Sequence, residues 1–214
     1  MLPGGAFGLG SSPNAQVPAA TFASSLTPGA NGISTDLAPD FVGKIVFEPG
    51  WGHYEIKGIS RWFRARFDGR NRAAPGAGLG VAALLPISGK LDLLLEGLAG
   101  RGIGRYAAAV GPDLAIGPDG SVHPIRATQA IGGLDWYPTQ TLQVYSYVGL
   151  ELYGRTSFPG STVGYGSPLL DLSPCVSQAG FPCPGGNRSI WQIMPGVWHS
   201  LARREHGMAV LEIS

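Results

Sequence analysis

The stretch from Thr141 to Arg155, T-L-Q-V-Y-S-Y-V-G-L-E-L-Y-G-R, constrains the fold more than any other part of the chain. From Leu142 to Leu152 the even positions are apolar apart from Ser146, and the odd positions carry glutamine, tyrosine, glycine and glutamate. Because successive side chains of a strand point to opposite faces, this pattern predicts a strand with one apolar and one polar, aromatic face. It is longer than the usual strand of about 5–6 residues, and it matches the roughly 9–11 residues that a tilted strand needs to cross a bilayer.

The composition favours the same interpretation. Only 14% of the 214 residues are charged, against roughly 25% in an ordinary soluble domain, so the chain has little with which to cover a water-facing surface. No run of about 18 apolar residues occurs, which excludes a transmembrane helix but not transmembrane strands, whose apolar residues alternate with polar ones. The net charge of +1 gives no reason to expect a nucleic-acid partner.

The same period of two predicts about eight strands over residues 40–214, preceded by an irregular Gly/Pro-rich segment over residues 1–39. The expected strands are Phe41–Glu48, His53–Phe67, Leu79–Leu85, Leu91–Gly104, Arg126–Tyr137, Thr141–Arg155, Ser189–Ala202 and Met208–Ser214. Their connections alternate between short and long, the long ones being Asp68–Gly78, Arg105–Ile125 and Arg155–Arg188. Transmembrane barrels sort their connections in this way, with short periplasmic turns and long external loops. The predicted fold is therefore an all-β, antiparallel, up-and-down transmembrane β-barrel.

Both ends of the chain indicate that these strands belong to a larger barrel. The first residues, M-L-P-G-G-A-F, lack the basic and apolar regions of a signal peptide, which an exported protein needs. If the short turns are periplasmic, both ends of the chain lie on the external side, whereas complete bacterial barrels place both on the periplasmic side. We therefore expect a partial barrel.

Three runs resemble porin-like outer-membrane proteins of Gram-negative bacteria, of the kind met in acidobacteria. They are V-G-K-I-V-F-E-P-G-W-G-H-Y-E (Val42–Glu55), L-A-G-R-G-I-G-R-Y (Leu98–Tyr106) and Y-G-R (Tyr153–Arg155). The resemblance implies a channel in the cell outer membrane for passive diffusion of small hydrophilic solutes. It also implies a homotrimer, with outer-membrane lipid and lipopolysaccharide as its surroundings.

Charged residues near the strand ends are candidates for the pore lining, since rings of charge set the selectivity of channels. The arginines predict a mild anion preference, and the acidic residues on polar faces oppose them only partly. An alternative places the arginines against lipopolysaccharide phosphates or solvent at the rim. Arg101 and Arg105 share the parity of the apolar Leu91, so either a bulge flips the register or the strand has already left the bilayer. The candidate pore-lining residues are Arg61, Arg101, Arg105, Asp92, Glu96, Asp135, Tyr147, Glu151 and Arg155.

Cys175 and Cys183 are the only cysteines, and both lie in the longest connection, which predicts a disulfide in an external loop. The sequence shows no nucleophile, metal or phosphate-binding motif, so we expect neither an enzyme, nor a cofactor, nor a metal site. Two alternatives stay open: a secreted soluble β-sandwich that binds carbohydrate through its aromatic residues, and an outer-membrane barrel enzyme.

Overall fold

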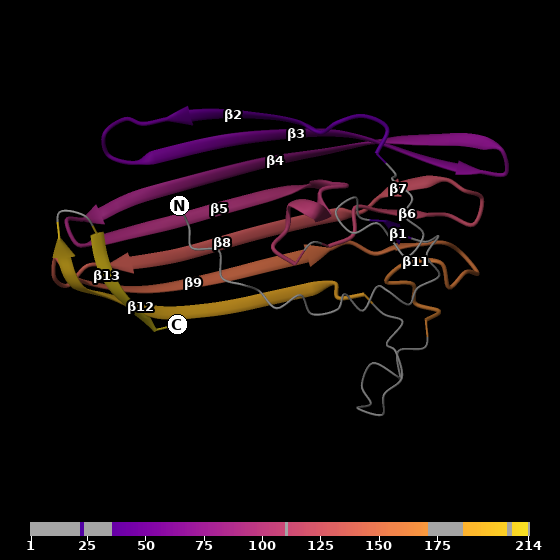
Figure 1. Cartoon of the computed structure of the whole chain (residues 1–214). Helices are drawn as coiled ribbons and strands as arrows, with labels where there is room; N and C mark the ends of the chain where they lie inside the picture. Colours follow the sequence, from indigo (N-terminus) through magenta and orange to yellow (C-terminus); the bar gives the residue numbers. More distant parts are fainter. Residues whose placement is uncertain (1–21, 24–35, 110, 171–185, 205–206, 214) are drawn as a thin grey trace, which may run out of the picture.

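The computed structural model describes residues 22–23, 36–109, 111–170, 186–204 and 207–213. Eight of their strands form one antiparallel sheet in the order β13-β12-β9-β8-β5-β4-β3-β2, so that neighbours in the chain are neighbours in the sheet (Figure 1). This arrangement confirms the predicted all-β, up-and-down fold. The strands are β2 (Phe41–Phe47), β3 (His53–Phe67), β4 (Arg70–Ser88), β5 (Leu91–Arg101), β8 (Arg126–Trp136), β9 (Leu142–Tyr153), β12 (Ser189–Arg204) and β13 (Gly207–Ile213).

The connection between β3 and β4 is a tight hairpin, and the polar loop expected over Asp68–Gly78 was wrong. Pairing runs without a break to Phe67↔Arg70, which leaves only Asp68 and Gly69 in the turn. Both have positive φ, 46° and 71°, as the two-residue hairpin turn favoured by Asp-Gly requires. The small residues after the turn have the composition of a loop, yet they pair fully with β3. The hairpin still extends beyond β5, whose last residue pairs with Ala77 (Figure 1).

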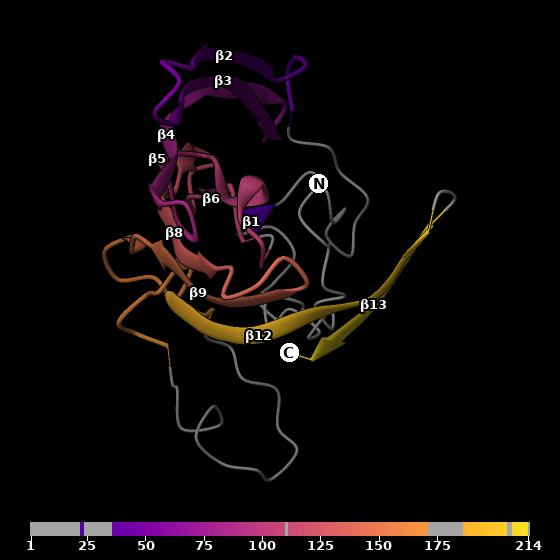
Figure 2. The same ribbon diagram turned by 90° about the vertical axis from the view of Figure 1, so that its left-hand side faces the viewer.

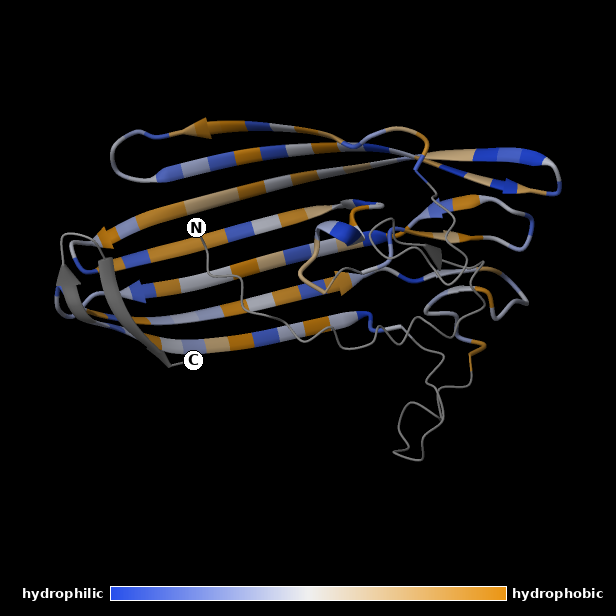
Figure 3. Ribbon diagram, in the orientation of Figure 1, coloured by the Kyte–Doolittle hydropathy of each residue, from blue (hydrophilic) through white to orange (hydrophobic). Residues whose placement is uncertain are grey.

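The sheet is curved like a trough (Figure 2), and hydrophobic residues alternate with hydrophilic ones along several of its strands (Figure 3). The apolar positions of β9 lie on the convex face, where Val148 is 48% exposed. Its partner on β12 is Ile193, and the pair Leu150 and Trp191 extends the same face. Other exposed apolar side chains on the convex face are Ile45, Ile56, Leu79, Val81, Leu95 and Leu134. Within the described residues nothing packs against this apolar surface.

The concave face receives the connection between β5 and β8, here called the inserted loop (residues 102–109 and 111–125). It contains the 3₁₀ helix Gly104–Tyr106 and the strands β6 (Leu114–Ile116) and β7 (Val122–Pro124). The strand β1 (Phe22–Ala23) pairs with β6, so part of the segment expected to be irregular joins this small sheet. Figure 2 shows these elements on the inner side of the trough.

The core of the molecule lies between the concave face and the inserted loop. One cluster unites buried residues of the loop with residues of β8, β9 and the short strand β11 (Gly164–Tyr165), namely Ile103, Ala107, Ala115, Ile125, Ala127, Tyr153 and Tyr165. A second cluster packs Phe63 of β3 against Leu114 and Val122. Full burial of a large apolar side chain contributes roughly 1.5–3 kcal/mol to stability, so these contacts hold the loop against the concave face of the sheet.

Glycines make room for this packing at two positions. A Cβ on Gly76 of β4 would lie 2.7 Å from the Phe63 ring, and one on Gly102 would lie 2.5 Å from it. Gly102 also has a φ of 71°, which turns the chain inward directly after β5. The inward fold of the loop therefore requires that neither of these two positions carries a side chain.

The connection between β9 and β12 contains two short paired strands, β10 (Thr156–Ser157) and β11 (Gly164–Tyr165). Cys175 and Cys183 lie outside the described residues, and their disulfide stays a prediction. In the part of the chain that the structure describes, no helix has the length and apolar character to span a membrane.

The assignment of the two faces predicts that an added arginine destabilises the protein more on the convex face than on the concave face. Val148→Arg places a charge in the middle of the convex face and should cost roughly 2–4 kcal/mol in unfolding experiments on the full-length protein in lipid vesicles. Ile131→Arg is the matched control, because Ile131 lies on the concave face opposite Glu96, which can pair with the new charge. Equal losses of stability for the two variants would contradict the assigned faces.

Candidate functional site: the concave face and its ion-pair cluster

Two arginines and three aspartates join the inserted loop to the sheet. Arg61 is completely buried on β3; its Nε donates to Asp40 Oδ1 at 3.0 Å and its Nη1 lies 2.7 Å from Asp113 Oδ1. Arg105 of the inserted loop reaches the same carboxylates, with Nη2 2.7 Å from Asp36 Oδ2, Nη1 3.2 Å from Asp40 Oδ2 and Nε 3.3 Å from Asp113 Oδ2. Each aspartate therefore serves both guanidinium groups. We call these five residues the arginine–aspartate cluster.

Aromatic rings complete the surroundings of the cluster. The Arg61 guanidinium lies over the ring of Phe63, 4.6 Å from its centroid, and 5.7 Å from that of Tyr106. The Tyr106 hydroxyl donates to Asp40 Oδ2 at 2.8 Å. Burial and this hydrogen bond raise the pKa of Tyr106 to about 12. Although burial raises the pKa of Asp40, its hydrogen bonds from Tyr106 and Arg61 and the two arginine charges together hold it below its usual value.

Two further side chains fasten the inserted loop to the wall. Glu151 of β9 accepts the backbone N–H of Ala109 at 3.0 Å and the Tyr153 hydroxyl at 2.8 Å. The amide of Gln129, in the orientation that satisfies both partners, donates to the Tyr106 carbonyl at 3.0 Å and accepts from Ala107 N–H at 3.1 Å. Polar contacts from β3, β8 and β9 thus hold the loop at several points.

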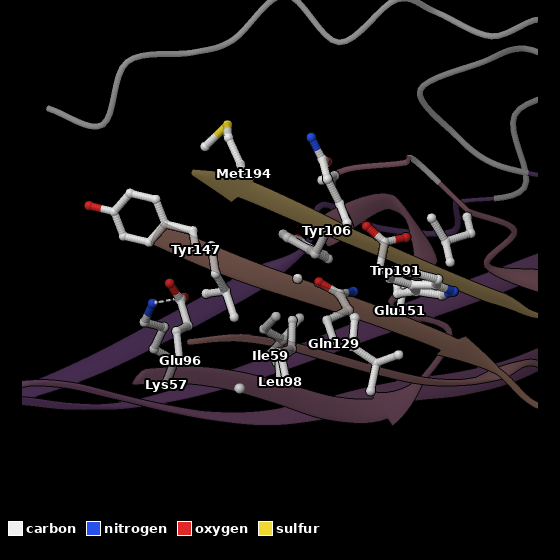
Figure 4. A pocket seen from close by; sticks show the side chains of 18 of the residues that line it. Lys57, Ile59, Glu96, Leu98, Tyr106, Gln129, Tyr147, Glu151, Trp191 and Met194 are labelled. Atoms are coloured by element: carbon white, nitrogen blue, oxygen red, sulfur yellow. Dashed lines mark hydrogen bonds and ion pairs between the residues drawn. The ribbon is translucent and has the colours of Figure 1, made fainter. Parts of the chain in front are cut away.

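Below the inserted loop lies a pocket of about 440 Å³ on the concave face. Figure 4 shows Tyr106 of the loop on one side and Gln129 and Glu151 of the wall on another. The Lys57–Glu96 ion pair also borders the pocket, with 2.5 Å between Nζ and Oε1. The remaining surface is largely apolar and includes Ile59, Leu98 and Met194. The pocket therefore offers a small number of polar groups within an apolar lining.

Ion pairs continue along the wall away from the pocket. The Lys44 ammonium of β2 lies 2.7 Å from Glu55 of β3, and Lys57 lies 3.3 Å from the same carboxylate. Together with Lys57–Glu96, these contacts form a row of alternating charges across β2, β3 and β5. Each charge has an opposite neighbour, so the row is polar without an excess of one sign.

The structure places most of the predicted pore-lining residues on the concave side, although it brings only some of them together. Arg61 and Arg105 share one cluster, and the Tyr147 hydroxyl donates to Asp135 at 2.8 Å. The register puts the remaining acidic residues Asp92, Glu96 and Glu151 on the same face at separate levels.

Two predicted residues lie elsewhere. Arg101 is exposed on the convex face, because it pairs with Ala77 and Arg126 in an unbroken register, and the bulge proposed to redirect it does not occur. Its assignment to the pore lining therefore needs correction. Arg155 follows the end of β9 and is exposed in the connection to β12.

Sequence reasoning did not find the three aspartates of the cluster. Asp36 lies in the segment expected to be irregular, Asp40 directly precedes β2, and Asp113 lies in the inserted loop. No spacing in the sequence links them to Arg61, since the pairing arises only when the loop folds inward. Lys57, by contrast, shares the parity of Glu55 and Arg61, so the alternation along the strand is enough to place it on the polar face.

Among known proteins, a similarity to this chain was found in a solved structure and not in sequence. No family model matches the sequence, and no curated protein matches it. The fold is similar to the crystal structure of the outer membrane channel DcaP of Acinetobacter baumannii, with a TM-score of 0.57 and 13% identity. The match covers 80% of this chain and 46% of that chain, so the chain spans about half the length of DcaP. At this identity the likeness shows the fold, and it gives no support to an acidobacterial origin.

The cluster predicts a large penalty for removing Arg61. Arg61→Met leaves buried carboxylates without their principal partner and should cost roughly 3–5 kcal/mol in unfolding experiments on the full-length protein. Arg64→Met is the matched control, because Arg64 lies three positions along the same strand, is exposed, and makes no ion pair with described residues. A small, equal loss for both variants would show that the cluster adds no stability.

The lowered pKa of Asp40 predicts that the inserted loop loosens in acid. Since the pKa of the folded state lies below the ordinary value of 3.8, the stability it confers is present above that value and is lost as the pH falls further. Pepsin should therefore cleave within residues 102–125 faster at pH 3 than at pH 5, relative to an unrelated peptide substrate. Arg61→Met should already be cleaved quickly at pH 5; if its cleavage still depends on pH as in the wild type, another group controls the loop.

Proposed function

We propose that this protein is a porin-like channel of the cell outer membrane. The observation that carries the proposal is the opposite chemistry of the two faces of one curved sheet. The convex face is apolar and exposed, as contact with lipid requires, while the concave face carries ion pairs, carboxylates and tyrosines, as the wall of a water-filled channel does. The similarity of the fold to the outer membrane channel DcaP supports the same proposal.

The proposed activity is passive diffusion of small hydrophilic solutes past the inserted loop. The pocket below the loop supports this activity, because it joins few polar groups to an apolar lining in which a solute is held weakly. Conduction requires that solutes enter such a site and leave it again. The loop crosses the concave side and so narrows the path, with the arginine–aspartate cluster as its principal attachment.

The anion preference expected from the sequence rests on Arg61, Arg101 and Arg105 as lumen charges. In the structure three aspartates neutralise Arg61 and Arg105, and Arg101 lies on the convex face. These contacts remove the premise of that preference for the described part of the wall. We therefore propose that the described wall lacks the anion preference expected from the sequence, because the concave-face charges outside its ion pairs, Asp92, Asp135 and Glu151, are acidic.

The apolar convex face also favours this proposal over a soluble β-sandwich. In a sandwich a second sheet packs on the apolar face of the first. Here the apolar face points away from every described segment, and Ile45 and Trp191 are 72% and 68% exposed.

We also propose that the protein forms a homotrimer. Native mass spectrometry of the full-length protein released from detergent would then show a mass three times that of one chain.

Planar-bilayer recordings of the full-length protein test the proposed function. We expect stepwise conductance in the wild type. Arg105→Ala should increase the conductance and its fluctuations, because it frees the inserted loop, whereas Arg101→Ala should change neither the conductance nor the reversal potential under a salt gradient. Failure of the wild type to conduct would refute the channel, and a shifted reversal potential in Arg101→Ala would refute the convex position of Arg101.

A further inference from the structure

Two arginines stand side by side on the convex face, outside the channel wall. Arg101 is the last residue of β5 and Arg126 the first of β8, and they are direct partners across the antiparallel pair. Both are exposed. Arg126 shares the parity of Thr128 and Leu134 on the convex face, so the two guanidinium groups leave the sheet on the same side.

Within the described residues no ion pair includes Arg101 or Arg126. Directly opposed side chains of an antiparallel pair have Cβ atoms about 4.5–5.5 Å apart, and like charges there repel each other. Arg61 and Arg105 also lie close together, but three aspartates between them balance their charges. The convex pair is therefore a site that an external anion would stabilise.

The position of the pair in the sheet identifies the environment of that anion. One row further into the sheet, the convex face carries Leu79 and Leu152, which are 63% and 42% exposed. The two long connections, residues 102–125 and 154–188, begin at this end, and long connections of transmembrane barrels are external. The pair thus lies where the apolar band ends on the external side.

We propose that Arg101 and Arg126 together bind the phosphate groups of a phosphorylated glycolipid, the lipid A part of lipopolysaccharide. This inference rests on the proposed function, because it requires the convex face to lie in the outer membrane. Guanidinium groups suit phosphate because they donate two parallel hydrogen bonds to its oxygens. The adjacent apolar band provides the surface for the acyl chains of the same molecule, which free phosphate lacks.

The test measures the affinity of the detergent-solubilised full-length protein for purified lipopolysaccharide by microscale thermophoresis. Arg101→Ala/Arg126→Ala should bind roughly 30-fold more weakly, from the usual contribution of two basic residues at an anionic membrane surface. The double lysine variant should retain most of the affinity. Arg70→Ala/Arg72→Ala is the matched control: it removes two charges from the same end of the sheet but from positions of concave parity, and should bind within about twofold of the wild type.

Two further ligands separate the lipid from other sources of phosphate. Lipid A without phosphates should bind the wild type as weakly as lipopolysaccharide binds the double alanine variant. Inorganic phosphate should bind far more weakly than lipopolysaccharide; equal affinity would overturn the lipid assignment in favour of a free-anion site. Unchanged affinity of the double alanine variant, or an equal loss in the control, would overturn the proposal.

Conductance of the same samples distinguishes this proposal from the proposed function. Loss of lipopolysaccharide affinity with normal conductance in Arg101→Ala/Arg126→Ala supports both, since the pair lies outside the channel. A conducting wild type whose affinity does not depend on the pair refutes the lipid site alone. A wild type that does not conduct refutes the channel and removes the basis for the lipid site.

Discussion

The burial of Arg61 is the constraint on which the inner side of this molecule depends. A guanidinium without access to water is tolerated only when carboxylates and hydrogen-bond acceptors surround it. Its partners come from the segment before β2 and from the inserted loop, and the carbonyl of Gly102 accepts a further hydrogen bond. One side chain on β3 therefore fixes three segments of the chain, and the inward position of the loop follows from it.

Small residues on the concave face of β4 make the inward position possible. A Cβ on Gly78 would lie 3.0 Å from Ile103 of the inserted loop, and a Cβ on Gly76 would overlap Phe63. The concave face of β4 therefore carries no large side chains at these positions, and the loop packs directly against the backbone. The Gly- and Ala-rich composition that gave this stretch the character of a loop is explained by its role as the surface that receives one.

The alternation of apolar and polar residues along the strands was sufficient to predict which side chains lie on the convex face of the sheet. The convex position of Val148 and the concave position of Tyr147 follow from parity alone, because an unbroken strand cannot change faces. The same rule applied strictly places Arg101 on the convex face, and only the assumption of a bulge moved it. The arginine–aspartate cluster could not be predicted, because Asp36 and Asp113 reach Arg61 through tertiary folding and not through a local pattern.

The pairing of charges on the concave face has a consequence for the proposed diffusion of solutes. An unpaired charge in a narrow channel binds a counter-ion strongly, since screening by water is incomplete there. In Lys44–Glu55 and Lys57–Glu96 each charge is already balanced by a partner on another strand, so this part of the wall presents local dipoles instead of a net charge. Dipoles hold water and polar solutes without retaining them, as passive diffusion requires. Arg101 and Arg126, which form no ion pair with described residues, lie on the convex face, where the proposed binding of an anion would leave the lumen open.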